Sequence, residues 1–213
     1  IFLNEFIRDE FKIPFSKYTI LPSAVDFDIF DKHPEIEKIE NKISFVGNLL
    51  RFGKERNLDT IIDAFSTSEL KEYQLSIIGG PETEVKKIRE SIKKNNISNI
   101  ELTGRLGRKD VVEELLSSSV GLLINSSDKH SKFFTSPLKY FEYLAARLKV
   151  VAIDFPSHKI LPNQENVYFF SHNKDSLIKA VKDAFNADFK DISKENISLN
   201  KRVQKIISLF EEF

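Results

Sequence analysis

The sequence contains no cysteine and no methionine. Without cysteine, neither a disulfide bond nor a thiolate metal site can form. The four histidines are scattered along the chain, and none has the spacing of a metal-binding helix face; they are His33, His130, His158 and His172. We therefore expect no metal cofactor, and we assign no role to His130, a lone loop histidine.

A net charge is also absent, because 32 basic residues balance 32 acidic ones. A chain without a basic excess is not expected to bind nucleic acid or a lipid surface as its main partner. No apolar run is long enough to cross a bilayer, and no secretory signal precedes the fold. We expect a cytoplasmic protein. Because the chain begins with Ile1 and lacks methionine, we also expect it to be part of a longer protein.

The sequence does contain a regular alternation of strand-like and helix-like segments. Apolar runs rich in β-branched residues predict strands at residues 42–46, 73–78, 99–103, 120–124, 149–153 and 166–170. Amphipathic segments between them predict helices at residues 59–65, 82–94, 109–117, 137–148 and 174–185. Apolar strands separated by such helices are typical of a parallel sheet covered on both faces. The predicted fold is a doubly wound α/β domain.

The two ends of the chain have a different character. Residues 1–12 predict an amphipathic helix, and residues 18–22 predict a strand that runs into a loop. Residues 31–41 are polar and charged and resemble a linker. Residues 199–213 predict a further helix with an apolar face. We expect these ends to pack on something outside the core domain.

One segment suggests a binding site, with the sequence TSPLKYFEYLAA at residues 135–146. Ser136 is expected to cap a helix that starts at Pro137, because serine offers an acceptor to the free amides and proline suits the first position. Such a helix start, beyond a parallel strand, is where an open α/β sheet binds anions. Lys139 can place its ammonium beside the anion, and Glu142 can accept two hydrogen bonds from a ribose diol.

Phosphate at the helix start and ribose one turn further along describe a nucleotide diphosphate. From the spacing alone, an ordinary solvated lysine and glutamate explain Lys139 and Glu142 equally well. The residues themselves therefore leave open whether Lys139 and Glu142 bind a nucleotide or are ordinary surface residues.

Together with KVVAID at residues 149–154, this segment resembles the family-4 type of retaining glycosyltransferase with the GT-B fold, in the subgroup with a Thr-Ser-Pro-Leu-Lys-x-x-Glu motif. Weaker matches follow in the family's order, at residues 20–30, 45–49, 77–81 and 100–104. The resemblance extends from about residue 1 to 210. It implies a Rossmann-like domain that is one half of a GT-B enzyme and binds a nucleotide diphosphate sugar.

The resemblance also implies a set of donor-binding residues. It assigns the ribose hydroxyls to Glu142 and the diphosphate to the helix start, and it places the base near the turn after the third strand. The implied nucleotide-binding residues are Gly47, Gly104, Arg105, Leu106, Thr135, Ser136, Pro137, Leu138, Lys139 and Glu142.

The sequence departs from the family pattern in three places. Many members have a second glutamate that contacts the transferred sugar, and Phe134 stands at that position here. Members of this subgroup commonly lack the second glutamate too. Arg147-Leu-Lys replaces a Gly-x-Pro turn. The loop after the first strand, GNLLRFGKERN at residues 47–57, is longer than usual. It offers three candidates for the cation that stabilises the departing diphosphate, namely Arg51, Lys54 and Arg56. The preferred register places Arg56-Asn57 where the family has Lys-Gly, with Arg51 as the second cation.

The resemblance implies three parts of the chain. Residues 1–40 would be the end of an N-terminal domain and the interdomain linker. Residues 41–190 would be the nucleotide-sugar-binding domain. Residues 191–213 would form a helix that packs toward the missing N-terminal domain, which would also bind the acceptor.

The implied activity is retaining transfer of a hexosyl or related group from a nucleotide sugar. A uridine diphosphate sugar is the first expected donor and a guanosine diphosphate sugar the second. The implied acceptor is a glycan or lipid-linked glycan, in bacterial polysaccharide, lipopolysaccharide or glycoprotein glycan synthesis. Membrane association would be at most peripheral, at the inner face of the cytoplasmic membrane, and the fragment alone would be inactive. The alternatives are a nucleotide-sugar 2-epimerase of GT-B-like fold and a non-catalytic nucleotide-binding module.

Overall fold

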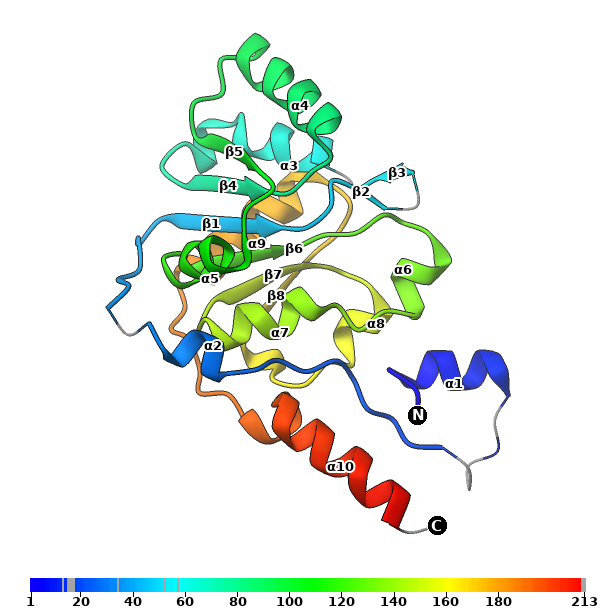
Figure 1. The fold of residues 1–213 in the computed structure, drawn as a ribbon. Coiled ribbons are helices and arrows are strands. Elements are labelled where there is room, and N and C mark those ends of the chain that lie inside the picture. Colours follow the sequence, from blue (N-terminus) through cyan, green and yellow to red (C-terminus); the bar gives the residue numbers. More distant parts are fainter. Residues whose placement is uncertain (13, 15–17, 34, 52, 57, 212–213) are drawn as a thin grey trace.

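The computed structural model describes residues 1–12, 14, 18–33, 35–51, 53–56 and 58–211, with only the main chain at residues 51, 54 and 55. Its centre is a six-stranded sheet in the order β5-β4-β1-β6-β7-β8 (Figure 1). Every neighbouring pair of strands in it is parallel. The strands are β1 (Lys42–Val46), β4 (Gln74–Ile78), β5 (Ile100–Gly104), β6 (Val120–Leu123), β7 (Lys149–Ile153) and β8 (Val167–Phe170). The predicted doubly wound α/β fold is confirmed.

Each face of the sheet has its own core cluster, because successive strand residues point to opposite faces. Phe45 and Ile77 belong to the first core cluster, whereas Val46 and Ile78 belong to the second. The helices that contribute to the first cluster are α3 (Leu58–Phe65), α4 (Glu82–Lys94) and α9 (Lys174–Phe185). Those that contribute to the second are α2 (Asp28–Asp31), α5 (Arg108–Leu116) and α7 (Leu138–Ala145).

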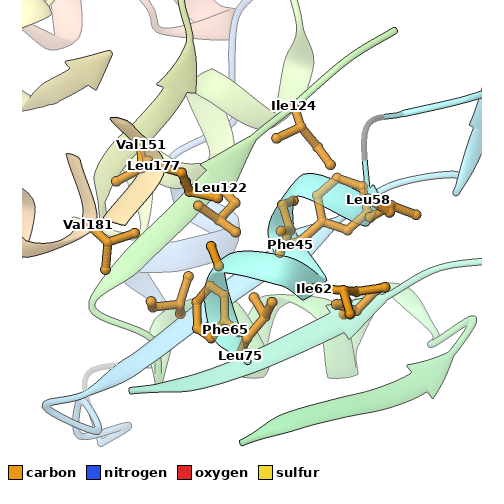
Figure 2. Packing of buried hydrophobic residues seen from close by; sticks show 14 of the residues in the cluster. Phe45, Leu58, Ile62, Phe65, Leu75, Leu122, Ile124, Val151, Leu177 and Val181 are labelled. Atoms are coloured by element: carbon orange, nitrogen blue, oxygen red, sulfur yellow. The ribbon is translucent and has the colours of Figure 1, made fainter. Parts of the chain in front are cut away.

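The first core cluster shows why the amphipathic pattern predicted helices correctly. Leu58, Ile62 and Phe65 recur at helical spacing in α3, and all are buried. Figure 2 shows these side chains directed toward strand residues such as Phe45. Burying an aliphatic or phenyl side chain of this size contributes about 1.5–3 kcal/mol. Burial of the α3 stripe therefore helps to hold this short helix on the sheet.

The structure adds short elements that the sequence pattern did not predict. They are α2 (Asp28–Asp31), the hairpin strands β2 (Leu50–Arg51) and β3 (Lys54–Glu55), α6 (Lys129–Phe133), α8 (Pro156–Lys159) and the 3-10 helices Ser68–Leu70, Gln164–Asn166 and Lys194–Asn196. None of them is long enough for a period of 3.6 or 2 residues to show in the sequence.

The ends of the chain form helices α1 (Glu5–Phe11) and α10 (Leu199–Glu211). The strand predicted at residues 18–22 is reduced to one bridge, between Ile20 and Phe2. The polar linker predicted at residues 31–41 is tied to the domain, since the Ile39 amide donates a hydrogen bond to the Ser117 carbonyl at 2.8 Å.

The segment between α1 and β1 packs across the domain. Val25, Phe27 and Phe30 are buried in the second core cluster. The Val25 amide also donates to the carbonyl of Ile197 at 2.9 Å, just before α10. Part of the region predicted to be interdomain linker is therefore fastened to this domain, where it borders α7.

Glycine turns hold the carboxyl ends of β1, β4 and β5 together. The Gly79 amide donates to the Gly104 carbonyl at 2.8 Å, and the Gly47 amide donates to the Ile78 carbonyl at 2.9 Å. Gly79 has φ 153°, and a Cβ atom there would lie 1.8 Å from the Gly47 carbonyl oxygen. Only glycine allows the turns to approach this closely.

Tyr143 fixes α7 to the middle of the sheet. Its hydroxyl accepts a hydrogen bond from the Val46 amide at 3.1 Å and donates one to the Leu122 carbonyl at 3.0 Å. β1 and β6 pair only at their amino ends, as far as Ser44 and Gly121. The hydroxyl therefore lies between the two strands where they separate. Full burial raises the pKa of the Tyr143 phenol.

The glycine turn predicts that Gly79→Ala is strongly destabilising. We expect it to lower the free energy of unfolding by about 3 kcal/mol or more, because the new Cβ overlaps the Gly47 carbonyl and the backbone angle is unfavourable for alanine. Urea denaturation followed by circular dichroism measures this. Gly107→Ala, at a position with negative φ before α5, is the control and should cost less than about 1 kcal/mol. Equal losses would contradict the prediction.

Tyr143→Phe should lower the free energy of unfolding by about 1–3 kcal/mol, because the buried Val46 amide and Leu122 carbonyl both lose a partner. The same denaturation measurement applies. The control is Tyr168→Phe on the edge strand β8, where the side chain is partly exposed. An effect of Tyr143→Phe no larger than that of the control would show that these bonds do not hold α7 in place.

Candidate functional site

The order of the sheet reverses between β1 and β6, and a hollow lies at the carboxyl ends of these strands beside α7, with a second hollow adjoining it. The first, of about 200 Å³, is bordered by Gly47, Arg56, Asn125 and the start of α7. The second, of about 310 Å³, lies between α7, α5 and the segment that includes Val25. Leu138 and Lys139 line both hollows. Ligands of open α/β sheets bind in this position, at the topological switch point.

A further hollow of about 370 Å³ lies toward the amino ends of β1, β4 and β5, where it is lined by Lys42 and Gln74 among others. Parallel sheets do not present their ligands at that end. We therefore place the site at the two hollows beside α7.

The start of α7 differs from the prediction. The helix begins at Leu138, Pro137 takes the cap position, and no side chain caps the helix. The Ser136 hydroxyl instead accepts a hydrogen bond from the Ser23 amide at 2.8 Å, and the Ser23 hydroxyl donates to the Ser136 carbonyl at 2.7 Å. The predicted capping role of Ser136 is wrong, because the segment before β1 passes over this turn and engages the serine.

Thr135 is also occupied by the fold. Its side chain is buried, and its hydroxyl donates to the Ser131 carbonyl at 3.1 Å and lies 3.1 Å from the Ser157 hydroxyl. The diphosphate role predicted for Thr135 therefore rests on its main chain. Leu138, in contrast, is 58% exposed at the edge of both hollows.

Lys139 and Glu142 form an ion pair on one face of α7. Each side chain is 30% exposed, and both line the second hollow. The sequence predicted separate partners for them, a phosphate for Lys139 and a ribose for Glu142. In the structure each is the partner of the other.

Among the three candidate cations after β1, Arg56 is the one whose side chain is described. Its Nη1 atom would lie 3.0 Å from a Cβ atom at Gly47, and the residue lines the first hollow. Its charge acts on the Tyr143 phenol and opposes the rise in that group's pKa. Arg51 and Lys54 pair through their main chains in the β2–β3 hairpin, and their side chains lie outside the description. Asn57 lies outside the described residues altogether.

The turn after β5 leads into α5, whose first residue, Arg108, lines the second hollow. Gly104 has φ 75°, and the Arg105 side chain crosses Gly80, with its Nε atom 2.9 Å from the Cβ position there. Leu106 packs against the second core cluster. The sequence analysis did not single out Arg108, which lines the second hollow together with Glu142. Arg108 directly precedes the helix predicted at residues 109–117, and this position was the signal for it.

Acidic and imidazole groups near the site are engaged in local bonds. Asp128 caps α6 and accepts hydrogen bonds from Ser126 and Ser131, which hold the pKa of its carboxyl well below the usual range. The buried His158 contacts the Ile153 carbonyl at 2.9 Å through Nδ1. Among the described residues, no group of three or more histidine, aspartate or glutamate side chains could hold a metal ion. The described helices include none that is long and apolar enough to span a membrane.

Comparison with solved structures gives several similar folds. A sucrose-phosphate synthase from Thermosynechococcus elongatus matches with a TM-score of 0.72 and 12% identity, over 99% of this chain and 57% of that one. A pneumococcal O-GlcNAc transferase, solved with UDP and GlcNAc, has a TM-score of 0.66 and 16% identity, over 99% of this chain and 44% of that one. The chain thus spans about half the length of these proteins.

An enzyme of another class also has a similar fold. The UDP-GlcNAc 2-epimerase of Methanocaldococcus jannaschii, solved with UDP-GlcNAc and UDP, matches with a TM-score of 0.59 and 12% identity, over 96% of this chain and 57% of that one. No curated protein matches the sequence significantly.

The family comparison is more specific than the structural one. A model of the family described as glycosyl transferases group 1 matches residues 40–187. This range contains all six strands of the sheet. It also contains α5 and α7, which line the hollows. The chain belongs to the glycosyl transferases group 1 family, and its domain has the fold of one half of a GT-B glycosyltransferase.

Proposed function

We propose that the chain binds a nucleotide diphosphate sugar and is the donor half of a retaining glycosyltransferase. The observation that carries the proposal is the arrangement around α7, where Arg56 borders one hollow, Glu142 borders the other, and Lys139 lies between them. This is a cationic region next to a hydrogen-bond acceptor, as a nucleotide diphosphate requires.

The donor would lie along α7. Its diphosphate would occupy the first hollow, against Arg56 and the positive end of the helix dipole. Its ribose would reach Glu142, about one helical turn or 5 Å further along the axis. The base would extend into the second hollow toward the turn after β5 and Arg108. A uridine diphosphate sugar is the donor we expect first, and the UDP in the pneumococcal transferase supports this choice.

Donor binding would exchange the partners of the Lys139–Glu142 ion pair. The ribose hydroxyls would donate to the Glu142 carboxylate, and the diphosphate would attract the Lys139 ammonium. Both groups exchange one charged or polar partner for another, so neither is left desolvated without a bond. When the glycosidic bond breaks, Arg56, Lys139 and the helix end would stabilise the negative charge that develops on the departing diphosphate.

A second domain would bind the acceptor. The fraction of the sucrose-phosphate synthase that this chain covers, 57%, leaves room for such a domain. On α10, Val203, Ile207 and Phe210 are exposed at helical spacing, and we propose that this apolar face packs on it. The chain alone would then bind the donor without transferring the sugar. The full enzyme would act on a glycan or lipid-linked glycan.

A nucleotide-sugar 2-epimerase is the second candidate, favoured by the similar fold of the archaeal epimerase. Both activities need the same donor site. Incubation with a radiolabelled UDP-sugar, with and without acceptor glycans, distinguishes them in the enzyme that contains both domains. An epimerase changes the sugar without an acceptor, whereas a transferase forms labelled product only when the acceptor is present.

Glu142→Ala should weaken the binding of UDP or GDP, whichever the wild-type chain binds, by about tenfold or more, because the ribose loses its hydrogen bonds to a carboxylate. Isothermal calorimetry measures the affinity. The control is Glu113→Ala, which also removes a paired glutamate, the partner of Lys109 on α5, and should leave the affinity unchanged. If Glu142→Ala binds the nucleotide as tightly as the wild type, the ribose role is wrong.

Arg56→Met should weaken UDP binding by about tenfold or more while leaving uridine binding unchanged, because only the diphosphate faces the guanidinium. The same calorimetry with both ligands tests this. Arg89→Met on α4, away from both hollows, is the matched control. An equal loss for UDP and uridine would show that Arg56 supports the fold of the site and does not bind phosphate.

A further inference from the structure

Asn4 is a buried amide that joins the start of the chain to the turn before α7. It is 2% exposed, and its Oδ1 atom accepts a hydrogen bond from the Ile7 amide at 3.0 Å, which caps α1. Its Nδ2 group donates to the carbonyls of Phe133 at 2.9 Å and Thr135 at 3.1 Å. These two carbonyls flank Phe134. The amide thus holds residues 133–135, which we call the Phe134 turn, from both sides.

Other contacts confirm that α1 packs on this region. The rings of Phe6 and Phe133 meet edge to face, with centroids 5.5 Å apart. Glu10 pairs with Lys129 on α6 at 2.8 Å. Figure 1 shows α1 on the same side of the molecule as α6. Two segments about 130 residues apart in sequence therefore form one wall beside the start of α7.

The position of this wall relative to the proposed donor follows from the direction of α7. If the ribose lies at Glu142 and the diphosphate at the start of the helix, the sugar lies beyond that start. The residues that precede this start in the chain, after α6, are those of the Phe134 turn. The Phe134 ring is partly exposed, with the Lys129 ammonium 5.3 Å from its centroid.

Capping α1 does not by itself require asparagine. Serine, threonine and aspartate cap helices through an acceptor oxygen as well. What they lack is an amide group that can donate two hydrogen bonds to two carbonyls in a buried position. The two hydrogen bonds that Asn4 donates to the Phe134 turn therefore explain why this position has an amide side chain.

We propose that Asn4 is a positioning residue for the sugar end of the donor site, which holds the Phe134 turn where the sugar of the bound donor lies. This inference rests on the proposed donor site. It makes the first residues of the chain part of the selection of the sugar, in addition to the loops at the carboxyl ends of the strands. In this arrangement the nucleotide would not contact the Asn4 side chain.

The experiment compares two affinities in each variant. Calorimetry gives the dissociation constant of UDP and that of the tightest binder among UDP-glucose, UDP-galactose and UDP-N-acetylglucosamine. If the wild-type chain prefers GDP, then GDP, GDP-mannose and GDP-fucose are used. In Asn4→Asp and Asn4→Ser, which keep an acceptor for the α1 cap, the ratio of the sugar-nucleotide constant to the nucleotide constant should rise about tenfold, the equivalent of one lost hydrogen bond.

The control is Glu10→Gln, which removes the charge of the Glu10–Lys129 ion pair between α1 and α6 and leaves the Asn4 hydrogen bonds intact. It should leave the ratio at the wild-type value. An unchanged ratio in both Asn4 variants would overturn the inference, and so would an equal loss of both affinities, which indicates a merely structural role. If Glu142→Ala weakens nucleotide binding as expected while the ratio of constants in the Asn4 variants stays at the wild-type value, this inference fails and the proposed function stands. If the wild type binds no nucleotide, the proposed function fails first.

Discussion

The attachment of α7 to the gap between β1 and β6 is the constraint on which the candidate site depends. Tyr143 bonds to both strands where they separate, and its ring lies so close to Gly121 that a Cβ atom there would be 2.5 Å away. With the helix fixed at this point, its first turn must face Gly47 and the loop that carries Arg56. The glycine turns complete the arrangement, because they allow the ends of neighbouring strands to meet without side chains between them.

The charged side chains of the site have partners or neighbours within the protein. Lys139 and Glu142 neutralise each other on α7, while Arg56 is held against the end of β1. Such an arrangement keeps the half-buried charges paired, and under the proposed function a nucleotide diphosphate would offer each a new partner. The segment before β1 contributes as well, since Ser23 binds Ser136 and fixes the turn that precedes the helix. The segment before β1 and the residues around α7 thus form the site together.

Much of the fold could be predicted, because burial imposes a period on the sequence. The predicted bounds of β1, β7, α4 and α9 agree with the structure, since their apolar residues follow the strand or helix period over their whole length. The prediction was wrong where contacts distant in sequence decide. The strand expected around Ile20 becomes a single bridge to Phe2, and the helix expected from Pro137 starts one residue later.

For the site, the sequence by itself determined that Lys139 and Glu142 share one face of a helix, because residues three apart in a helix are neighbours. It also placed this helix after an apolar strand in a family with a known order of segments. Only the tertiary structure decided what surrounds the helix start. Ser136 is bound by Ser23, and the Phe134 turn is bound by Asn4. These are hydrogen bonds between residues more than 100 positions apart, and no local pattern records which distant group will reach a given donor or acceptor.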